Sequence, residues 1–144
     1  MRWETSLEID APAERVWDLT VDVAGWPAFT PTMQSVQRLD DGAFGMGSSA
    51  RIKQPGQGPA VWTVTAFEPG RGFSWSTRRM GLTMTGGHRI TPRDGGCVNT
   101  LSIELTGAGS RVMWLLLGGL MRRSISTENA GFKAKAEAQA GRPA

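Results

Sequence analysis

The C-terminal third of the chain contains one long stretch with helical periodicity, and this stretch limits the folds open to the rest. After Gly107 and Gly109, Ser110 can cap a helix that continues to about Gln139. One largely apolar stripe of this helix consists of Trp114, Leu117, Met121, Ile125, Glu128, Phe132 and Ala136. Such a helix is about 40 Å long, and a flat sheet of short strands does not need that much cover. We therefore expect a sheet that curls around the helix.

Alternating apolar and polar residues predict seven short strands before this helix. In the first, residues 3–9, Thr5, Leu7 and Ile9 share one face. Clusters of Gly, Pro and Asp separate the other six, which are predicted at 34–40, 47–53, 60–67, 73–78, 82–91 and 97–106. Connections of turn length favour antiparallel hairpins over parallel crossovers.

Two short helical segments are predicted between the first and second strands. Asp10 can accept a backbone hydrogen bond at a helix start, and Pro12 suits a first turn, so a helix should run from there to about Val23. Trp26 and Phe29 follow, and both are too large and apolar for an exposed loop. We expect them to lie on a second short turn of helix that packs inward.

This order of elements, together with several sequence segments, resembles the START-related, polyketide cyclase/dehydrase-like superfamily (SRPBCC). The segments that carry the resemblance are Leu7 to Asp18 (LEIDAPAERVWD), Trp26-Pro27, Val64 to Pro69, Phe73-Ser74-Trp75, His88 to Pro92, Asp94-Gly95-Gly96 and the terminal helix from Ser110. The resemblance implies an α+β helix-grip fold: a seven-stranded curved antiparallel sheet around a long C-terminal helix, with two short helices after the first strand. It also implies a cavity between sheet and helix, which the family uses for lipids, polyketides and other apolar ligands. Family members include both enzymes and carriers, so the fold alone does not decide between them.

Composition indicates one folded domain over residues 1–144. Hydrophobic residues make up 40% and charged residues 20% of the chain, as in ordinary globular proteins. The net charge of +3 comes from scattered arginines and lysines, so we expect no nucleic-acid partner. The longest apolar run, Val112 to Met121, is too short to cross a bilayer, which takes about 20 residues. A single cysteine and an N-terminus without a secretion-signal pattern favour the cytoplasm.

The motif inventory argues against most cofactor chemistry. The chain has one histidine, one cysteine and no tyrosine, so we expect no metal site. It has no glycine-rich nucleotide motif after a strand and no Gly-x-Ser-x-Gly elbow, so no cofactor is expected and serine hydrolysis is disfavoured. Cys97 beside Gly96 is interpreted as a small packed residue.

His88 is the one candidate for acid/base catalysis. It shares a strand face with Leu82, Met84 and Ile90, which should look into the interior. An imidazole there could move a proton in an enolisation, cyclisation or dehydration, or donate a hydrogen bond to a ligand oxygen. The alternative is a histidine that hydrogen bonds only to the protein itself.

Aromatic and thioether side chains predict the ligand-binding wall. The predicted ligand-binding residues are Trp26, Phe29, Trp62, Val64, Phe73, Trp75, Met84, His88, Met121 and Ile125. The competing interpretation is that these side chains only fill the core. Glu128 on the helix stripe and Arg51 on a strand could add a charge, but such groups often lie in solvent.

Three functions remain open on this basis. The first is the binding of a hydrophobic, lipid- or polyketide-like small molecule between sheet and helix, which the scarcity of polar catalytic groups favours. The second is a cyclase or dehydrase that uses His88. The third is a membrane-surface or protein-interaction module, which exposure of the Val112 to Met121 run would favour. Both a monomer and a dimer are compatible with the sequence.

Overall fold

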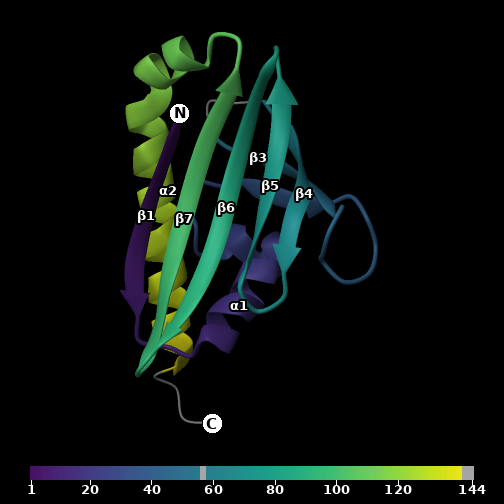
Figure 1. Cartoon of the computed structure of the whole chain (residues 1–144). Coiled ribbons are helices and arrows are strands. Elements are labelled where there is room, and N and C mark those ends of the chain that lie inside the picture. Colours follow the sequence, from purple (N-terminus) through teal and green to yellow (C-terminus); the bar gives the residue numbers. More distant parts are fainter. Residues whose placement is uncertain (56–57, 141–144) are drawn as a thin grey trace.

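The computed structural model describes residues 1–55 and 58–140 and shows a helix-grip architecture (Figure 1). The elements in chain order are β1 (Arg2–Ile9), α1 (Ala13–Val21), η1 (Val23–Ala28), β2 (Ser35–Arg38), β3 (Ser49–Lys53), β4 (Ala60–Glu68), β5 (Gly72–Arg79), β6 (Leu82–Arg93), β7 (Gly96–Gly107) and α2 (Ser110–Ala140). The strands form one antiparallel sheet in the order β1-β7-β6-β5-β4-β3-β2. The curved sheet, its seven strands and the two short helical segments confirm the predicted fold class.

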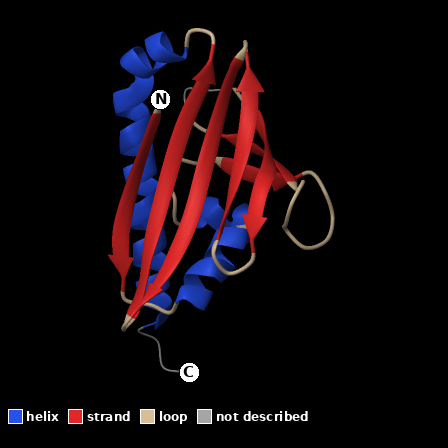
Figure 2. Ribbon diagram, viewed as in Figure 1, coloured by secondary structure: helices blue, strands red, loops and turns tan. Residues whose placement is uncertain are grey.

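All helices lie on one side of the sheet, and α2 runs along β1 and β7 (Figure 2). The alternation along β7 explains this arrangement, because every second residue from Cys97 to Leu105 is buried against the helices. None of the helices in residues 1–55 and 58–140 is long and apolar enough to span a bilayer.

The start of α1 differs from the prediction that Asp10 caps it. Pro12 occupies the N-cap position, and its carbonyl accepts hydrogen bonds from the backbone N–H groups of Arg15 and Val16 at 3.0 and 3.3 Å. The Asp10 carboxylate accepts a hydrogen bond from Arg93 instead, at 3.2 Å. Asp10 therefore links the end of β1 to Arg93 of β6 instead of capping α1.

A pair of buried asparagines fastens α2 to the sheet. Asn99 Nδ2 on β7 donates to Asn129 Oδ1 on α2 at 2.9 Å. Asn129 Nδ2 in turn donates to the backbone oxygens of Asn99 and Thr5 at 3.1 and 3.2 Å. Because both side chains are fully buried, these bonds specify the position of α2 along β1 and β7.

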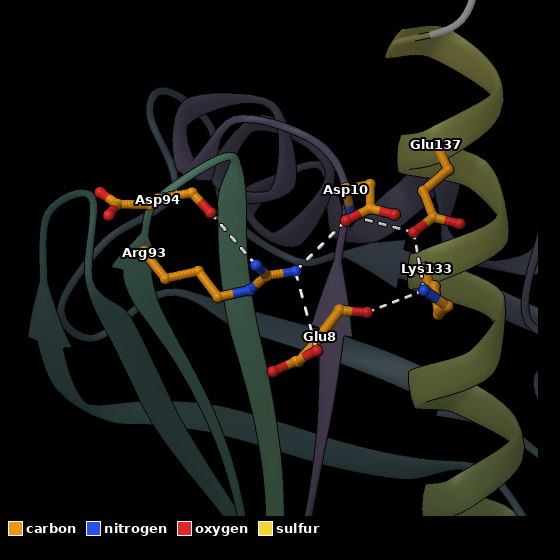
Figure 3. A network of polar contacts seen from close by, with 6 residues as sticks. All are labelled: Glu8, Asp10, Arg93, Asp94, Lys133 and Glu137. Atoms are coloured by element: carbon orange, nitrogen blue, oxygen red, sulfur yellow. Dashed lines mark hydrogen bonds and ion pairs between the residues drawn. The ribbon is translucent and has the colours of Figure 1, made fainter.

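A surface network holds the last third of α2 at the same end of the sheet as α1 (Figure 3). Lys133 Nζ donates to the Glu8 backbone oxygen at 2.8 Å and to Glu137 Oε2 at 2.7 Å. The backbone N–H of Asp10 donates to the same Glu137 oxygen at 2.9 Å. Arg93, from β6, reaches Asp10, so strands and helix are tied together here.

The two halves of α2 differ in burial. In the second half Glu128, Phe132 and Ala136 are buried, as the predicted stripe requires. In the first half Leu117 is exposed although the stripe placed it inward, and Trp114 and Met121 are only half-buried. The sheet therefore grips α2 mainly through its second half.

The start of α2 lies close to the predicted position. Ser110 is the first helical residue, so it belongs to the first turn instead of preceding it as a cap. The Gly109 carbonyl accepts a hydrogen bond from the backbone N–H of Met113 at 3.0 Å.

Candidate functional site

The predicted aromatic residues meet in one packed cluster on the face of the sheet that looks toward α2. Trp26 of η1 lies 5.4 Å from Trp75 and 5.7 Å from Phe132 of α2, measured between ring centroids. Phe73 contacts Trp75 at 5.3 Å. Trp26 is fixed in turn because its Nε1 donates to the Leu19 carbonyl at 3.1 Å. These buried rings fill the interior at this level with the protein's own side chains.

His88 lies inside this cluster. Its ring stacks on Phe73 at 4.9 Å with an interplanar angle of 12°, and Trp26 lies 5.0 Å away. Within the described residues, the buried Nδ1 atom has no hydrogen-bond partner. Burial lowers the pKa of His88 to about 3, so the imidazole is neutral near neutral pH. The arrangement leaves Nδ1 without the protein partner that a purely structural histidine usually has.

The remaining predicted wall residues are only half-buried. Trp62 on β4 and Met84 on β6 face the helix side of the sheet, and Met121 and Ile125 lie on the inward stripe of α2. Gly86 has room for one methyl group on this face of the sheet, because a Cβ atom there would meet the Trp75 and Trp62 rings at 3.6 and 3.8 Å, which are ordinary contact distances. We call Trp62, Met84, Met121 and Ile125 the open wall.

The other two predicted ligand contacts, Val64 and Phe29, pack against this cluster. Val64 is buried in the core beneath it, and Phe29 is half-buried against Phe132 with ring centroids 5.0 Å apart. The structure thus separates the ten predicted residues into a packed floor and the open wall.

Glu128 is the residue that the sequence interpretation undervalued. Its side chain is only 6% exposed and lies one helical turn from both Ile125 and Phe132. Thr32 Oγ1 donates to Glu128 Oε1 at 3.1 Å. Burial raises the pKa of Glu128 to about 7, an effect that the Thr32 hydrogen bond opposes. Its place between two apolar residues of the inward stripe was the available signal, whereas Arg51 is exposed on β3.

Two hollows of the described surface lie away from the open wall. One, of about 490 Å³, lies between α1 and the end of α2, beside Arg15, Asp18 and Gln139. The other, of about 420 Å³, lies over β4 to β6, beside Ala66, Gly72 and Ser74, and is also lined by Phe73 and His88. Neither is lined by a residue of the open wall, so the predicted internal cavity stays a prediction.

Comparisons with known proteins agree with this architecture. A family model described as polyketide cyclase / dehydrase and lipid transport matches residues 1–137. No curated protein matches the chain.

Solved structures share the fold at low sequence identity. The Zhui aromatase/cyclase from Streptomyces sp. R1128 is 19% identical, with 97% of this chain and 95% of that chain covered and a TM-score of 0.76. The di-domain ARO/CYC StfQ from the steffimycin biosynthetic pathway is 16% identical, with 98% of this chain but only 52% of that chain covered and a TM-score of 0.81. TTHA0849 from Thermus thermophilus is 15% identical, with 98% and 100% covered and a TM-score of 0.77. Because the family model covers nearly the whole sequence, the chain belongs to the polyketide cyclase/dehydrase and lipid transport family.

Proposed function

We propose that this protein binds an apolar small molecule, of lipid or polyketide type, against the open wall. The observation that carries the proposal is the half-exposure of Trp62, Met84, Met121 and Ile125 directly beside a core that is otherwise tightly packed. Large apolar side chains that face an interior and yet remain in contact with water favour an apolar ligand. Covering them contributes about 25 cal/mol of binding free energy for each Å² of apolar surface removed from water.

The chemistry of the wall fits a flat or flexible ligand. Trp62 offers a ring face 6.0 Å from Trp75, and stacking on such a face suits conjugated rings. Met84 and Met121 adapt to different ligand shapes because the thioether side chain is flexible and polarizable. Trp26, Phe29, Val64, Phe73, Trp75 and His88 would form the floor beneath the ligand. The family description, which includes both polyketide chemistry and lipid transport, supports this ligand class.

Glu128 favours a second candidate function, a cyclase or dehydrase. A buried carboxyl group that exchanges its proton near pH 7 can act as a general acid toward a departing hydroxyl group and then as a base. In this version Glu128 performs the proton transfer and the neutral His88 accepts or donates a hydrogen bond. The aromatase/cyclase structures that share the fold are compatible with this candidate.

Binding is tested by fluorescence titration with an apolar probe such as anilinonaphthalene sulfonate, together with native mass spectrometry of co-purifying molecules. Met84→Trp and Ile125→Trp should each weaken probe binding about tenfold, because the larger side chain occupies the wall. Val61→Trp is the matched control, since Val61 precedes Trp62 on β4 and is exposed on the other face. Equal affinities for all three variants would place the ligand elsewhere.

Turnover is tested separately with Glu128→Gln and His88→Phe on an aromatisable polyketide-like substrate. Loss of product with Glu128→Gln at unchanged probe affinity supports the enzyme. A carrier without turnover shows no product with either the unmodified protein or the variants.

A further inference from the structure

The first half of α2 presents an apolar face to solvent. Leu115 is 84% exposed and Leu116 is 72% exposed, and Val112 and Leu120 are exposed on the same side of the helix. The spacing of these four positions, three and four residues apart, makes them neighbours on one helical face. These apolar side chains face solvent, whereas the large apolar side chains in the second half of α2 face the sheet.

The β5–β6 turn adds one more apolar side chain at the same end of the sheet. Met80 is 93% exposed and has a left-handed backbone conformation, φ 55°, which a bulky residue rarely adopts. The turn lies beside the end of β7, which leads into α2, because Leu82 pairs with Gly107 and the backbone of Gly81 lies close to Gly107. Figure 1 shows the turn and the first turns of α2 at this one end. We call Met80, Val112, Leu115, Leu116 and Leu120 the apolar end.

The residues around the apolar end carry positive charge. Arg78 and Arg79 precede Met80, and Arg111 and Arg123 lie at either end of the helical face, all of them exposed. The sequence has no Asp or Glu in residues 69–93 or 105–127, the two segments that contain the apolar end. The start of β1 also lies here, but its Glu4 points to the outer face of the sheet and is paired with Arg2 at 3.0 Å. Glu104, just before the second segment, points to the face of the sheet away from the helices, because its neighbours Ile103 and Leu105 are the buried ones. An apolar face bordered by arginines complements an anionic lipid surface.

We propose that the apolar end docks on a membrane that contains anionic lipids, with the first half of α2 lying along the lipid surface. The four helix residues and Met80 enter the boundary between headgroups and acyl chains, while the arginines contact lipid phosphates. A second copy of this chain fits less well, because a face-to-face pair brings the arginines of both copies together. Docking does not require that the open wall hold a ligand. A negative result in the docking test therefore leaves the proposed ligand binding unaffected, and a negative result in the ligand-binding test leaves docking unaffected.

Docking would also give the open wall access to lipid. Trp114 and Met121 lie on the half of α2 that carries the apolar end. Met84 lies two residues after Leu82, the residue with which β6 begins after the β5–β6 turn. A ligand leaving the membrane at this point would therefore reach the open wall over a short path.

Vesicle flotation tests the proposal with the whole chain. We expect binding to vesicles of phosphatidylcholine with about 30% phosphatidylglycerol and much weaker binding to phosphatidylcholine alone. The double variant Leu115→Gln/Leu116→Gln should lower the partition coefficient at least about tenfold. Arg79→Gln/Arg123→Gln should lower it about twentyfold at low salt and less at high salt.

Met46→Gln is the matched control for Met80→Gln. Met46 is also exposed, but it lies in the β2–β3 connection at the opposite edge of the sheet. Met80→Gln should weaken vesicle binding and Met46→Gln should not, with unchanged circular dichroism for both. Absence of binding, equal binding to both kinds of vesicle, or equal effects of the two methionine variants overturns the proposal. So does a dimer in light scattering that Leu115→Gln/Leu116→Gln converts to monomer, because the face is then a protein interface.

Discussion

Thr32 Oγ1 donates a hydrogen bond to Glu128 Oε1 at 3.1 Å, and this hydroxyl is the polar partner that the structure gives to a buried carboxyl group. One neutral donor compensates only part of the desolvation of a carboxylate. Glu128 therefore holds its proton to a higher pH than an exposed glutamate does, and its pKa rises to about 7. The folded state consequently binds a proton at Glu128 that the unfolded chain releases at lower pH.

Glu128→Gln should change how stability depends on pH. A carboxyl whose pKa is raised from 4.5 to about 7 stabilises the fold fully below about pH 4.5, and this contribution is lost as the pH rises through 7. Relative to the unmodified protein, the variant should gain about 3 kcal/mol between pH 4 and pH 8. Urea unfolding across this range measures the difference. A constant difference would show that the pKa of Glu128 is the same in the folded and the unfolded state.

His88→Phe should make the protein more resistant to acid. Burial lowers the pKa of His88 from 6.5 to about 3, so its contribution is fully present above about pH 6.5 and is lost as the pH falls through 3. Phenylalanine has no proton to bind and preserves the stacking on Phe73. We expect the acid-unfolding midpoint to move to lower pH, with little change in stability at pH 8, because the variant removes a buried nitrogen that has no partner. An unchanged midpoint would indicate that other groups control acid unfolding.

Asn129→Ala should loosen α2 from the sheet. The substitution removes three hydrogen bonds and leaves the buried Asn99 amide without its acceptor, at a cost of about 3 kcal/mol. Thr127→Ala is the control, because the Thr127 hydroxyl makes an exposed hydrogen bond to the Arg123 carbonyl one turn earlier on the same helix. Thermal unfolding compares the two variants, and equal losses would contradict a fastening role for the asparagine pair.

Period-two alternation predicted the sheet because one face of each strand is buried. β7 is the clearest case: Cys97, Asn99, Leu101, Ile103 and Leu105 are all buried, and the predicted strand at 97–106 matches Gly96–Gly107. The pairing of consecutive strands from β2 to β7 followed from short connections, which favour antiparallel hairpins. The pairing of β1 with β7 did not follow from any turn, because these strands lie at opposite ends of the sequence.

The orientation of the first half of α2 was not predictable in the same way. Leu115, Leu116 and Leu117 are consecutive and apolar, so the segment has no polar face to indicate which side turns outward. The stripe that continued from Phe132 and Ile125 placed Leu117 inward, and the structure exposes it. The stripe placed Glu128 inward, as the structure has it, but its hydrogen bond with Thr32 was not predictable, because sequence spacing along α2 contains no information about the loop that carries Thr32.

Gly86 should respond to substitution in a way that distinguishes an open wall from a filled core. A Cβ atom at Gly86 would meet the Trp75 and Trp62 rings at ordinary contact distances, so Gly86→Ala should stabilise the protein by about 0.5–1 kcal/mol. Gly86→Leu extends further into the space beside Trp62 and should reduce the affinity for an apolar probe about tenfold without unfolding the protein. Differential scanning calorimetry and probe titration give the two readouts.

Gly72→Ala is the contrasting variant, because its Cβ atom would collide with the His88 carbonyl on the neighbouring strand and should destabilise the sheet. The two glycines lie on adjacent strands, so the comparison separates a collision with backbone at Gly72 from ordinary contact with side chains at Gly86. If Gly86→Leu unfolds the domain as Gly72→Ala does, the space beside Trp62 is already occupied by the protein's own side chains, and the ligand must lie elsewhere.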